Sequence, residues 1–214
     1  MFRQYFGNNI VKLERNGITI GLVADTHIPQ ASESLPQQVY SNLKGVDYIL
    51  HAGDMHVIDV LDWLEEVAPV MAARGDGDHR ISYTSRDSSY RPVEKISYPG
   101  VPDDPRVKDT QVLDLEGLTI GLTHVFRNPK ETPWESLEEQ MDRVFQRHVD
   151  IVVCGHSHVA QIIRCGDVLI VNPGSPTLPN GILDLGTIGM LKIDRGIAEA
   201  KIIHLGTGRA SKET

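Results

Sequence analysis

Cysteine is scarce in this sequence, and long apolar runs are missing. Two cysteines, Cys154 and Cys165, are too few for a disulfide framework, which favours a reducing cytoplasm. No run of about 18 or more apolar residues occurs, so no membrane-spanning segment is predicted. The first 17 residues lack a continuous apolar stretch and a small-residue cleavage site, so they are not predicted to be a secretory signal.

Basic residues are outnumbered by acidic ones. The chain has 21 Lys and Arg against 29 Asp and Glu, which gives a formal net charge of -8. Proteins that bind the nucleic-acid backbone usually carry a basic surface, so stable nucleic-acid binding is not expected. A small phosphate ester remains compatible with this balance, because bound metal cations would reverse the field locally.

Short apolar runs alternate with amphipathic segments along most of the chain. The length of 214 residues and the hydrophobic fraction of 40% suit a single domain over residues 1–214, or at most two small domains. Buried strands are predicted at 18–24, 46–50, 69–73, 118–123 and 150–154. Helices are predicted between them, at 36–44, 57–67 and 133–148. This alternation predicts an α/β fold.

The last third of the chain has a different pattern. Residues 160–175 and 188–205 each contain two strand-like runs around a tight turn, which predicts late antiparallel hairpins. Residues 79–110 are polar and rich in Pro, Ser and Asp. A connection of this length predicts either a lid or binding loop, or a mobile segment. Residues 206–214 are predicted to be a disordered tail.

Side chains that bind metals follow five of the predicted strands. They are Asp25 and His27, Asp54, Asp76, His124, and His156 and His158. Because open α/β sheets place their ligands at the carboxyl ends of the strands, we expect these side chains on one rim. Carboxylates mixed with imidazoles suit Zn, Mn, Fe or Ni. Seven ligands are too many for one ion, so the pattern predicts two divalent metal ions that share a bridging carboxylate.

The order of these motifs resembles the calcineurin-like metallophosphoesterase superfamily. The family pattern runs D-x-H, G-D, G-N-[H/C]-[E/D], a lone H and G-H-x-H. The matching positions here are Asp25 and His27, Gly53 and Asp54, residues 75–78, His124, and residues 155–158. Residues 172–175 (Asn-Pro-Gly-Ser) also match a small prokaryotic phosphodiesterase branch, which includes a scaffold-type relative in the eukaryotic retromer.

The resemblance covers roughly residues 18–205, the core of the single predicted domain, and implies a two-sheet β-sandwich flanked by helices, with a dinuclear metal centre. One ion would be held by Asp25, His27, Asp54 and His158, and the other by Asp54, Asp76, His124 and His156. It also implies hydrolysis of a phosphate ester. In such centres the ions lie about 3.5–4 Å apart and acidify a bridging water, whose hydroxide attacks phosphorus in line. Asp54, Asp76 and His124 are therefore expected to be catalytic residues as well as ligands.

Three positions depart from the family pattern. Asp76 replaces an asparagine and makes the centre less positive, and we hypothesise that it favours a more highly charged ion such as Fe(III). Unchanged metal content and pH profile in Asp76→Asn would contradict that idea. Gly77 replaces a histidine that protonates the leaving group, which should favour good leaving groups and leaves His79 as a candidate acid. Val125 replaces a frequent glycine after His124 and should reshape a wall of the site.

Several residues near these motifs have two readings. Asp78 is an alternative ligand to Asp76, although it lies two positions late. His51 is either a partner that orients a ligand or a buried structural histidine. His56, His148 and His204 lie on helix or strand patterns and are predicted to be structural. Asn172 and Ser175 either support the site through hydrogen bonds or only form a turn.

The favoured function is a cytoplasmic phosphodiesterase that hydrolyses a small or nucleotide-like diester, with manganese among the candidate metals. A non-catalytic scaffold of the same fold is one alternative. A phosphomonoesterase or protein phosphatase is another, and differs only in substrate. These residues do not define the substrate, and specificity is expected to reside in segments 79–110 and 125–133. A homo-oligomer is compatible with the sequence.

Overall fold

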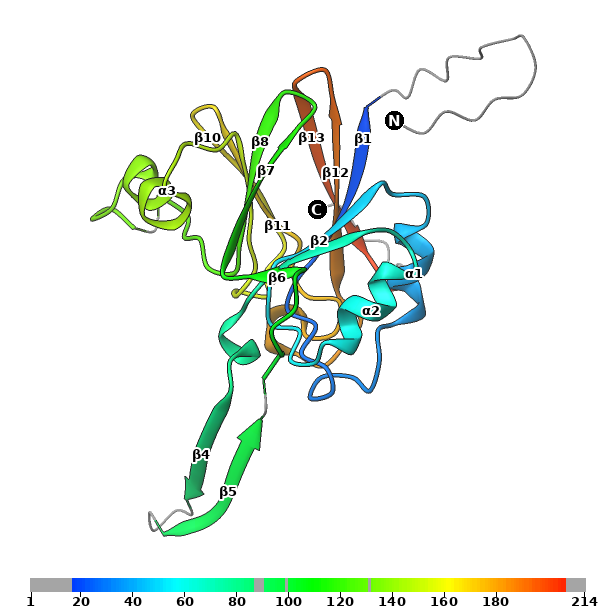
Figure 1. Ribbon diagram of the computed structural model, residues 1–214, viewed down its shortest axis with the longest axis vertical. Helices are drawn as coiled ribbons and strands as arrows, with labels where there is room; N and C mark the ends of the chain where they lie inside the picture. The colour runs from blue at the N-terminus through cyan, green and yellow to red at the C-terminus, as the bar shows by residue number, and fades with distance from the viewer. Residues whose placement is uncertain (1–16, 87–90, 99, 131, 207–214) are drawn as a thin grey trace, which may run out of the picture.

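Two β-sheets face each other and carry helices on their outer sides (Figure 1). The computed structural model describes residues 17–86, 91–98, 100–130 and 132–206. The predicted fold class, an α/β two-sheet sandwich flanked by helices, is confirmed. In the described part of the chain, no helix has both the length and the apolar character needed to cross a membrane.

The first sheet has the strand order β13-β12-β1-β2-β3-β6. Its strands are β1 (Ile18–Val23), β2 (Tyr48–His51), β3 (Val70–Ala73), β6 (Val107–Lys108), β12 (Thr187–Asp194) and β13 (Ile197–His204). β1, β2 and β3 are parallel, and α1 (Gln37–Leu43) and α2 (Asp59–Glu65) make the crossovers between them. β12 and β13 form the later predicted hairpin, and β12 pairs antiparallel with β1.

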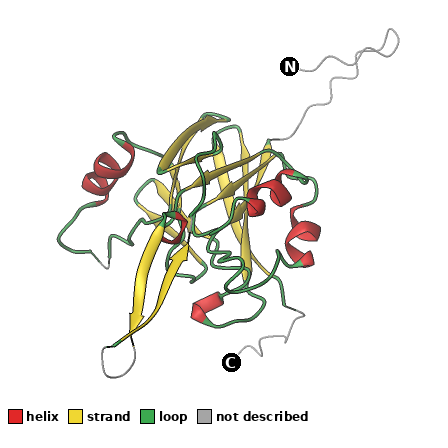
Figure 2. Ribbon diagram, turned by 60° about the horizontal axis from the view of Figure 1, so that its bottom comes forward, coloured by secondary structure: helices red, strands yellow, loops and turns green. Residues whose placement is uncertain are grey.

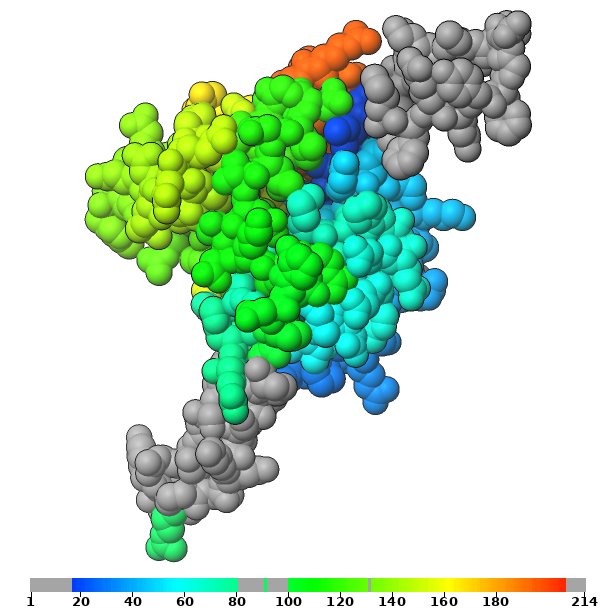
Figure 3. Space-filling view, in the orientation of Figure 1, coloured from blue at the N-terminus to red at the C-terminus, as the bar shows by residue number. Residues whose placement is uncertain are grey.

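The second sheet has the strand order β10-β11-β9-β8-β7. Its strands are β7 (Thr110–Leu115), β8 (Leu118–Thr123), β9 (Ile151–Val153), β10 (Gln161–Cys165) and β11 (Val168–Asn172). β10 and β11 form the earlier predicted hairpin. α3 (Leu137–Phe145) connects the parallel strands β8 and β9, and with its neighbouring segments it forms one flank of the molecule (Figure 3).

The central strands are buried on both faces. Along β1, Ile20 and Leu22 point into the layer between the sheets, whereas Val23 packs in the cluster that contains α1 and α2. Along β9, Val153 faces the layer between the sheets and Val152 faces the cluster that contains α3. Double burial explains why these strands are continuous apolar runs rather than alternating patterns.

α3 begins four residues later than its amphipathic pattern indicates. Its start is set by a capping box, in which Ser136 Oγ accepts a hydrogen bond from the Glu139 amide at 3.2 Å. The Glu139 carboxylate in turn accepts one from the Ser136 amide at 2.8 Å. This reciprocal pair fixes the first helical residue at Leu137, so Pro133 lies outside the helix.

Half of residues 79–110 lie in strands, so the expectation of one long loop is wrong, while a role as a lid or binding segment stays a prediction. β4 (Ile81–Arg86) and β5 (Pro92–Tyr98) pair as an antiparallel ribbon that projects from the body (Figure 2). Ile, Tyr, Thr and Val recur among the polar residues of this segment, and these types favour strands. The sequence pattern also missed β7. Of the predicted tail, residues 207–214 lie outside the described residues.

Gly121 in β8 allows the close approach of α3. A Cβ built at this position would lie only 2.6 Å from Phe145 Cζ. We expect Gly121→Ala to lower the free energy of unfolding by about 1–3 kcal/mol, because the aromatic ring must move in a packed layer. Denaturant titration measures this change. Gly206→Ala is the control, since its nearest neighbour would be 4.0 Å away. Equal stability of the two variants would contradict the packing described here.

Candidate metal centre

The seven predicted ligands lie at one rim, where the carboxyl ends of parallel strands from both sheets meet. Asp25 and His27 follow β1, Asp54 follows β2, Asp76 follows β3, His124 follows β8, and His156 and His158 follow β9. The structure brings them into two groups, and within each group the candidate ligand atoms lie within 4.8 Å of one another. Segments more than 130 residues apart in the sequence therefore converge on a small volume.

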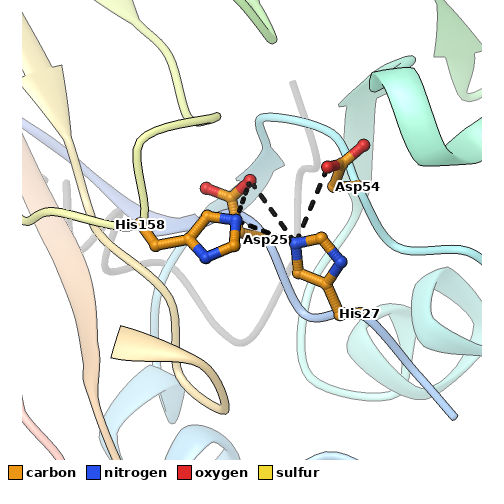
Figure 4. Close-up of side chains that lie close together, drawn as sticks. All are labelled: Asp25, His27, Asp54 and His158. Atoms are coloured by element: carbon orange, nitrogen blue, oxygen red, sulfur yellow. Dashed lines mark hydrogen bonds and ion pairs between the residues drawn. The ribbon is translucent and has the colours of Figure 1, made fainter. Parts of the chain in front are cut away.

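The first group consists of Asp25, His27, Asp54 and His158 (Figure 4). The Nε2 atoms of His27 and His158 lie 3.0 Å apart. His27 Nε2 is 3.6 Å from Asp54 Oδ2, and His158 Nε2 is 3.7 Å from Asp25 Oδ1. All four side chains point toward a common centre, as Figure 4 shows.

The second group consists of Asp76, His124 and His156. His156 Nδ1 lies 3.3 Å from Asp76 Oδ2, and both side chains are more than half exposed. His124 Nε2 lies 3.5 Å from Asp54 Oδ2, the same oxygen that faces His27. Asp54 thus occupies the position between the two groups that a bridging carboxylate requires.

Two buried atoms show that this donor set fits a cation. Asp25 Oδ2 and His124 Nε2 are the buried side-chain polar atoms without a hydrogen-bond partner in the described residues. His124 Nδ1 donates to the Ala52 carbonyl at 2.8 Å, so the ring presents its Nε2 lone pair to the site once Nε2 has lost its proton. Unpaired buried acceptors are costly unless a cation binds them, and mixed carboxylate and imidazole donors suit transition metals.

The protonation of these ligands reflects burial and crowding. Burial raises the pKa of Asp25 to about 7. Burial lowers the pKa of His27 to about 4, which keeps this ring neutral at physiological pH. Burial acts to raise the pKa of Asp54, but His124 and the Gly77 amide outweigh it and hold that pKa below its usual range. Asp54 is therefore ionised even at low pH.

The backbone of the ligand loops is held in an unusual conformation. Six of the ten described non-glycine residues with positive φ lie here: Asp25, His27, Asp54, His56, His156 and His158. Left-handed backbone costs a residue of this kind about 1–2 kcal/mol. Such strain persists only when the surrounding structure enforces it, and it clusters at functional sites. The loops are thus preorganised to present their side chains.

Asp78 helps to hold the backbone of the ligand loops in this conformation and is not itself a ligand candidate. Its Oδ2 accepts hydrogen bonds from the amides of Asp54 at 2.9 Å and Gly75 at 2.7 Å. Its Oδ1 accepts from the His56 amide at 2.7 Å. The carboxylate is fully buried and is in neither group, whereas Asp76 projects beside His156. The alternative alignment that makes Asp78 a ligand has no support in this geometry.

The Asn-Pro-Gly-Ser segment supports two ligand loops at once. Asn172 Nδ2 donates to the Gly155 carbonyl at 2.7 Å, and Ser175 Oγ donates to the Asp25 carbonyl at 2.7 Å. Thr177 Oγ1 donates to the Thr26 carbonyl at 2.7 Å. Of the two readings of this segment, support of the site is the one that these bonds favour.

His51 lies behind the ligands and is completely buried. Its Nδ1 accepts from the Gly53 amide at 3.2 Å, and its Nε2 lies 3.3 Å from Thr26 Oγ1. Burial lowers the pKa of its ring to about 4, so it is neutral at physiological pH. His51 therefore connects the loop before Asp54 to the loop that carries Asp25 and His27.

His56 is the residue that sequence reasoning missed, having been read as structural on a helix pattern. Its ring packs edge-on against His27 with centroids 4.5 Å apart, and its Nδ1 lies 2.7 Å from Gln30 Oε1. A Cβ at Gly77 would collide with His56 Nε2. The imidazole of His56 thus fills space next to the position where the family pattern has its histidine. The D-x-H spacing of Asp54 and His56, which repeats that of Asp25 and His27, was the available signal.

His79, the candidate acid, follows the 3₁₀-helix η1 (Asp76–Asp78) and is exposed. It belongs to neither ligand group. Its role in proton transfer stays a prediction.

Sequence comparison identifies the family that carries these motifs. A model described as the calcineurin-like phosphoesterase superfamily domain matches residues 18–196. A probable metallophosphoesterase from Methanothermobacter thermautotrophicus is 30% identical over 187 residues, which cover 87% of this chain and 92% of that relative. The region 18–196 that the family model matches includes all seven ligand candidates.

Solved structures share the fold at lower identity. Vacuolar Protein Sorting 29 from Cryptosporidium parvum has a TM-score of 0.59 at 21% identity, over 87% of this chain and 97% of that one. A structure described as a novel archaeal phosphodiesterase has a TM-score of 0.53 at 19% identity, over 87% of this chain and 100% of that one. These likenesses show the fold alone.

The two neighbouring aspartates should respond differently to truncation. Asp76→Ala is expected to reduce the number of bound metal ions while changing the free energy of unfolding by less than about 0.5 kcal/mol, because the side chain is 70% exposed. Asp78→Ala strands three amide donors and should destabilise the protein by about 3 kcal/mol. Metal analysis and denaturant titration measure both effects, with Asp109→Ala as an exposed control. The reverse pattern would make Asp78 the ligand.

Metal affinity is expected to rise with pH. In the metal-free protein burial raises the pKa of Asp25 to about 7. Burial acts to lower the pKa of His124, but Asp54 outweighs it and raises that pKa to about 9. Both groups must lose their protons to bind a cation, so affinity should fall up to about tenfold for each proton and pH unit below these values. Calorimetry in buffers of different ionisation enthalpy counts the released protons. Affinity that is independent of pH would contradict the prediction.

Proposed function

The chain belongs to the calcineurin-like phosphoesterase superfamily, and we propose that it is a metal-dependent phosphodiesterase acting on a small or nucleotide-like diester. One observation carries the proposal: Asp54 Oδ2 lies between two ligand groups, 3.6 Å from His27 and 3.5 Å from His124. Two adjoining cation sites that share a carboxylate are the arrangement that suits displacement at phosphorus.

Each part of the site has a role in this proposal. Asp25, His27, Asp54 and His158 hold one divalent ion, and Asp54, Asp76, His124 and His156 hold the other. When bound, the pair supplies Lewis acidity that activates water and offsets charge on the phosphate oxygens. The metal is Mn, Fe, Ni or Zn by the nature of its donors.

The protein's own groups orient the site. The Ala52 carbonyl fixes the tautomer and direction of His124 through its Nδ1. The amide of Gly77 donates to Asp54 Oδ1 at 2.7 Å, which leaves Oδ2 as the oxygen that faces both groups. The exposed pair Asp76 and His156 places the second group at the mouth of the site, where a substrate phosphate can reach it.

Neither Gly77 nor His79 places an acid beside the ligand groups to protonate the leaving group. Gly77 offers no side chain, and His79 is exposed outside both ligand groups. We therefore expect diesters with acidic leaving groups to be cleaved best. The absence of a well-placed acid is also the reason for expecting diesters rather than monoesters as substrates.

The free thiols Cys154 and Cys165 fit a cytoplasmic site of action.

A role as an interaction module is the second candidate function. Ile182 and Leu183 are 65% and 68% exposed in the segment that follows the Asn-Pro-Gly-Ser turn. A solved neighbour of this fold is a vacuolar sorting protein. The complete ligand set argues against a purely structural role, because a scaffold gains nothing from buried ligand atoms that lack hydrogen-bond partners.

Assays of bis-p-nitrophenyl phosphate and p-nitrophenyl phosphate with added Mn, Ni, Fe or Zn test the proposal. We expect metal-dependent cleavage that favours the diester, and a loss of about a thousandfold or more in kcat/KM for Asp54→Ala and His124→Ala. Leu183→Ala is the matched control. Bound metal without turnover of either ester would favour the interaction module, and activity that survives both site variants would contradict the proposed centre.

A further inference from the structure

A cleft of about 470 Å³ opens directly beside the second ligand group. Gly155, His156 and Ser157 form its wall on the side of the metal centre. Residues 125–128, 132 and 134, between β8 and α3, also line the cleft. A phosphate held at His156 would therefore lie at the edge of this cleft, where an ester group can enter it.

The cleft combines an apolar interior with an exposed aromatic rim. Phe126 and Ile170 line it from the buried side. At the rim, Val125 is 36% exposed, Val159 is 45% exposed and Trp134 is 71% exposed. A tryptophan this exposed leaves a large apolar ring in water, and such rings commonly serve in binding.

Polar groups border the same cleft. Arg127 and Gln161 lie among its lining residues. A guanidinium can stack on an aromatic face, and an amide can bond the polar edge of a heterocycle. The volume falls within the range of pockets that hold small ligands.

We propose that this cleft binds a planar aromatic ester group of the substrate, an aryl ring or a nucleobase, with Trp134 as its stacking surface. The inference rests on the proposed function, because it assumes that the phosphate is held at the metal centre. Trp134 then determines specificity, so aromatic esters should be selected over alkyl esters of the same charge. Val125, the residue that replaces a family glycine, forms part of the same wall.

Two phosphonates that carry no cleavable ester bond separate binding from turnover. The metal-loaded protein with Trp63→Phe has Trp134 as its single tryptophan. Phenylphosphonate and methylphosphonate are titrated into it, with tryptophan fluorescence and calorimetry as readouts. We expect phenylphosphonate to bind about tenfold more tightly and to change the fluorescence of Trp134.

Trp134→Ala and Leu183→Ala complete the test. The ratio of the two Kd values should fall to about one in Trp134→Ala and stay near ten in Leu183→Ala, whose side chain is 68% exposed and does not line the cleft. Equal Kd values in the unsubstituted protein, a ratio that Trp134→Ala does not change, or no binding of either phosphonate would each overturn the inference. Diester turnover measured on the same samples decides the proposed function separately, since that function requires no aromatic preference.

Discussion

The structure depends on one constraint, which is that two buried metal-ligand atoms around Asp54 lack hydrogen-bond partners among the described residues. Asp54 lies between two groups of ligands, and its ionised carboxylate is kept in place by the Gly77 amide and by the Asp78 network under its own backbone. Asp25 Oδ2 and His124 Nε2 are buried beside it without partners. Burying ligand atoms without hydrogen-bond partners is unfavourable, and bound cations would offset that cost by coordinating them. The site is therefore best understood as a template for metal binding.

The fold supplies this template by bringing two parallel sheet portions to a common rim. β1, β2 and β3 of one sheet and β8 and β9 of the other end at the same place, and each is buried on both faces. Packing on both faces therefore holds each strand up to the turn that carries its ligand. Beyond them, left-handed residues and hydrogen bonds from Asp78, Asn172 and Ser175 fix the loops. The left-handed residues lower the stability of the loops, and the packing of the two sheets offsets this cost.

Much of this could be predicted from the sequence, because strands buried on both faces leave continuous apolar runs and metal ligands follow them directly. The same reasoning failed at β4, β5 and β7, because their apolar residues are interspersed with polar ones and do not form the continuous runs that mark the central strands. Asp78 was ambiguous because the sequence does not distinguish an aspartate that binds a metal from one that accepts hydrogen bonds from three backbone amides. His56 was misread because its packing against His27 joins two loops that are separate in the sequence.

Anomalous diffraction from crystals of the manganese-loaded protein tests the dinuclear centre most directly. We expect two peaks at the Mn absorption edge. One should lie among Asp25, His27, Asp54 and His158 and the other among Asp76, His124 and His156, with Asp54 adjacent to both. A single peak, or peaks away from these residues, would contradict the claim that Asp54 bridges two metal ions.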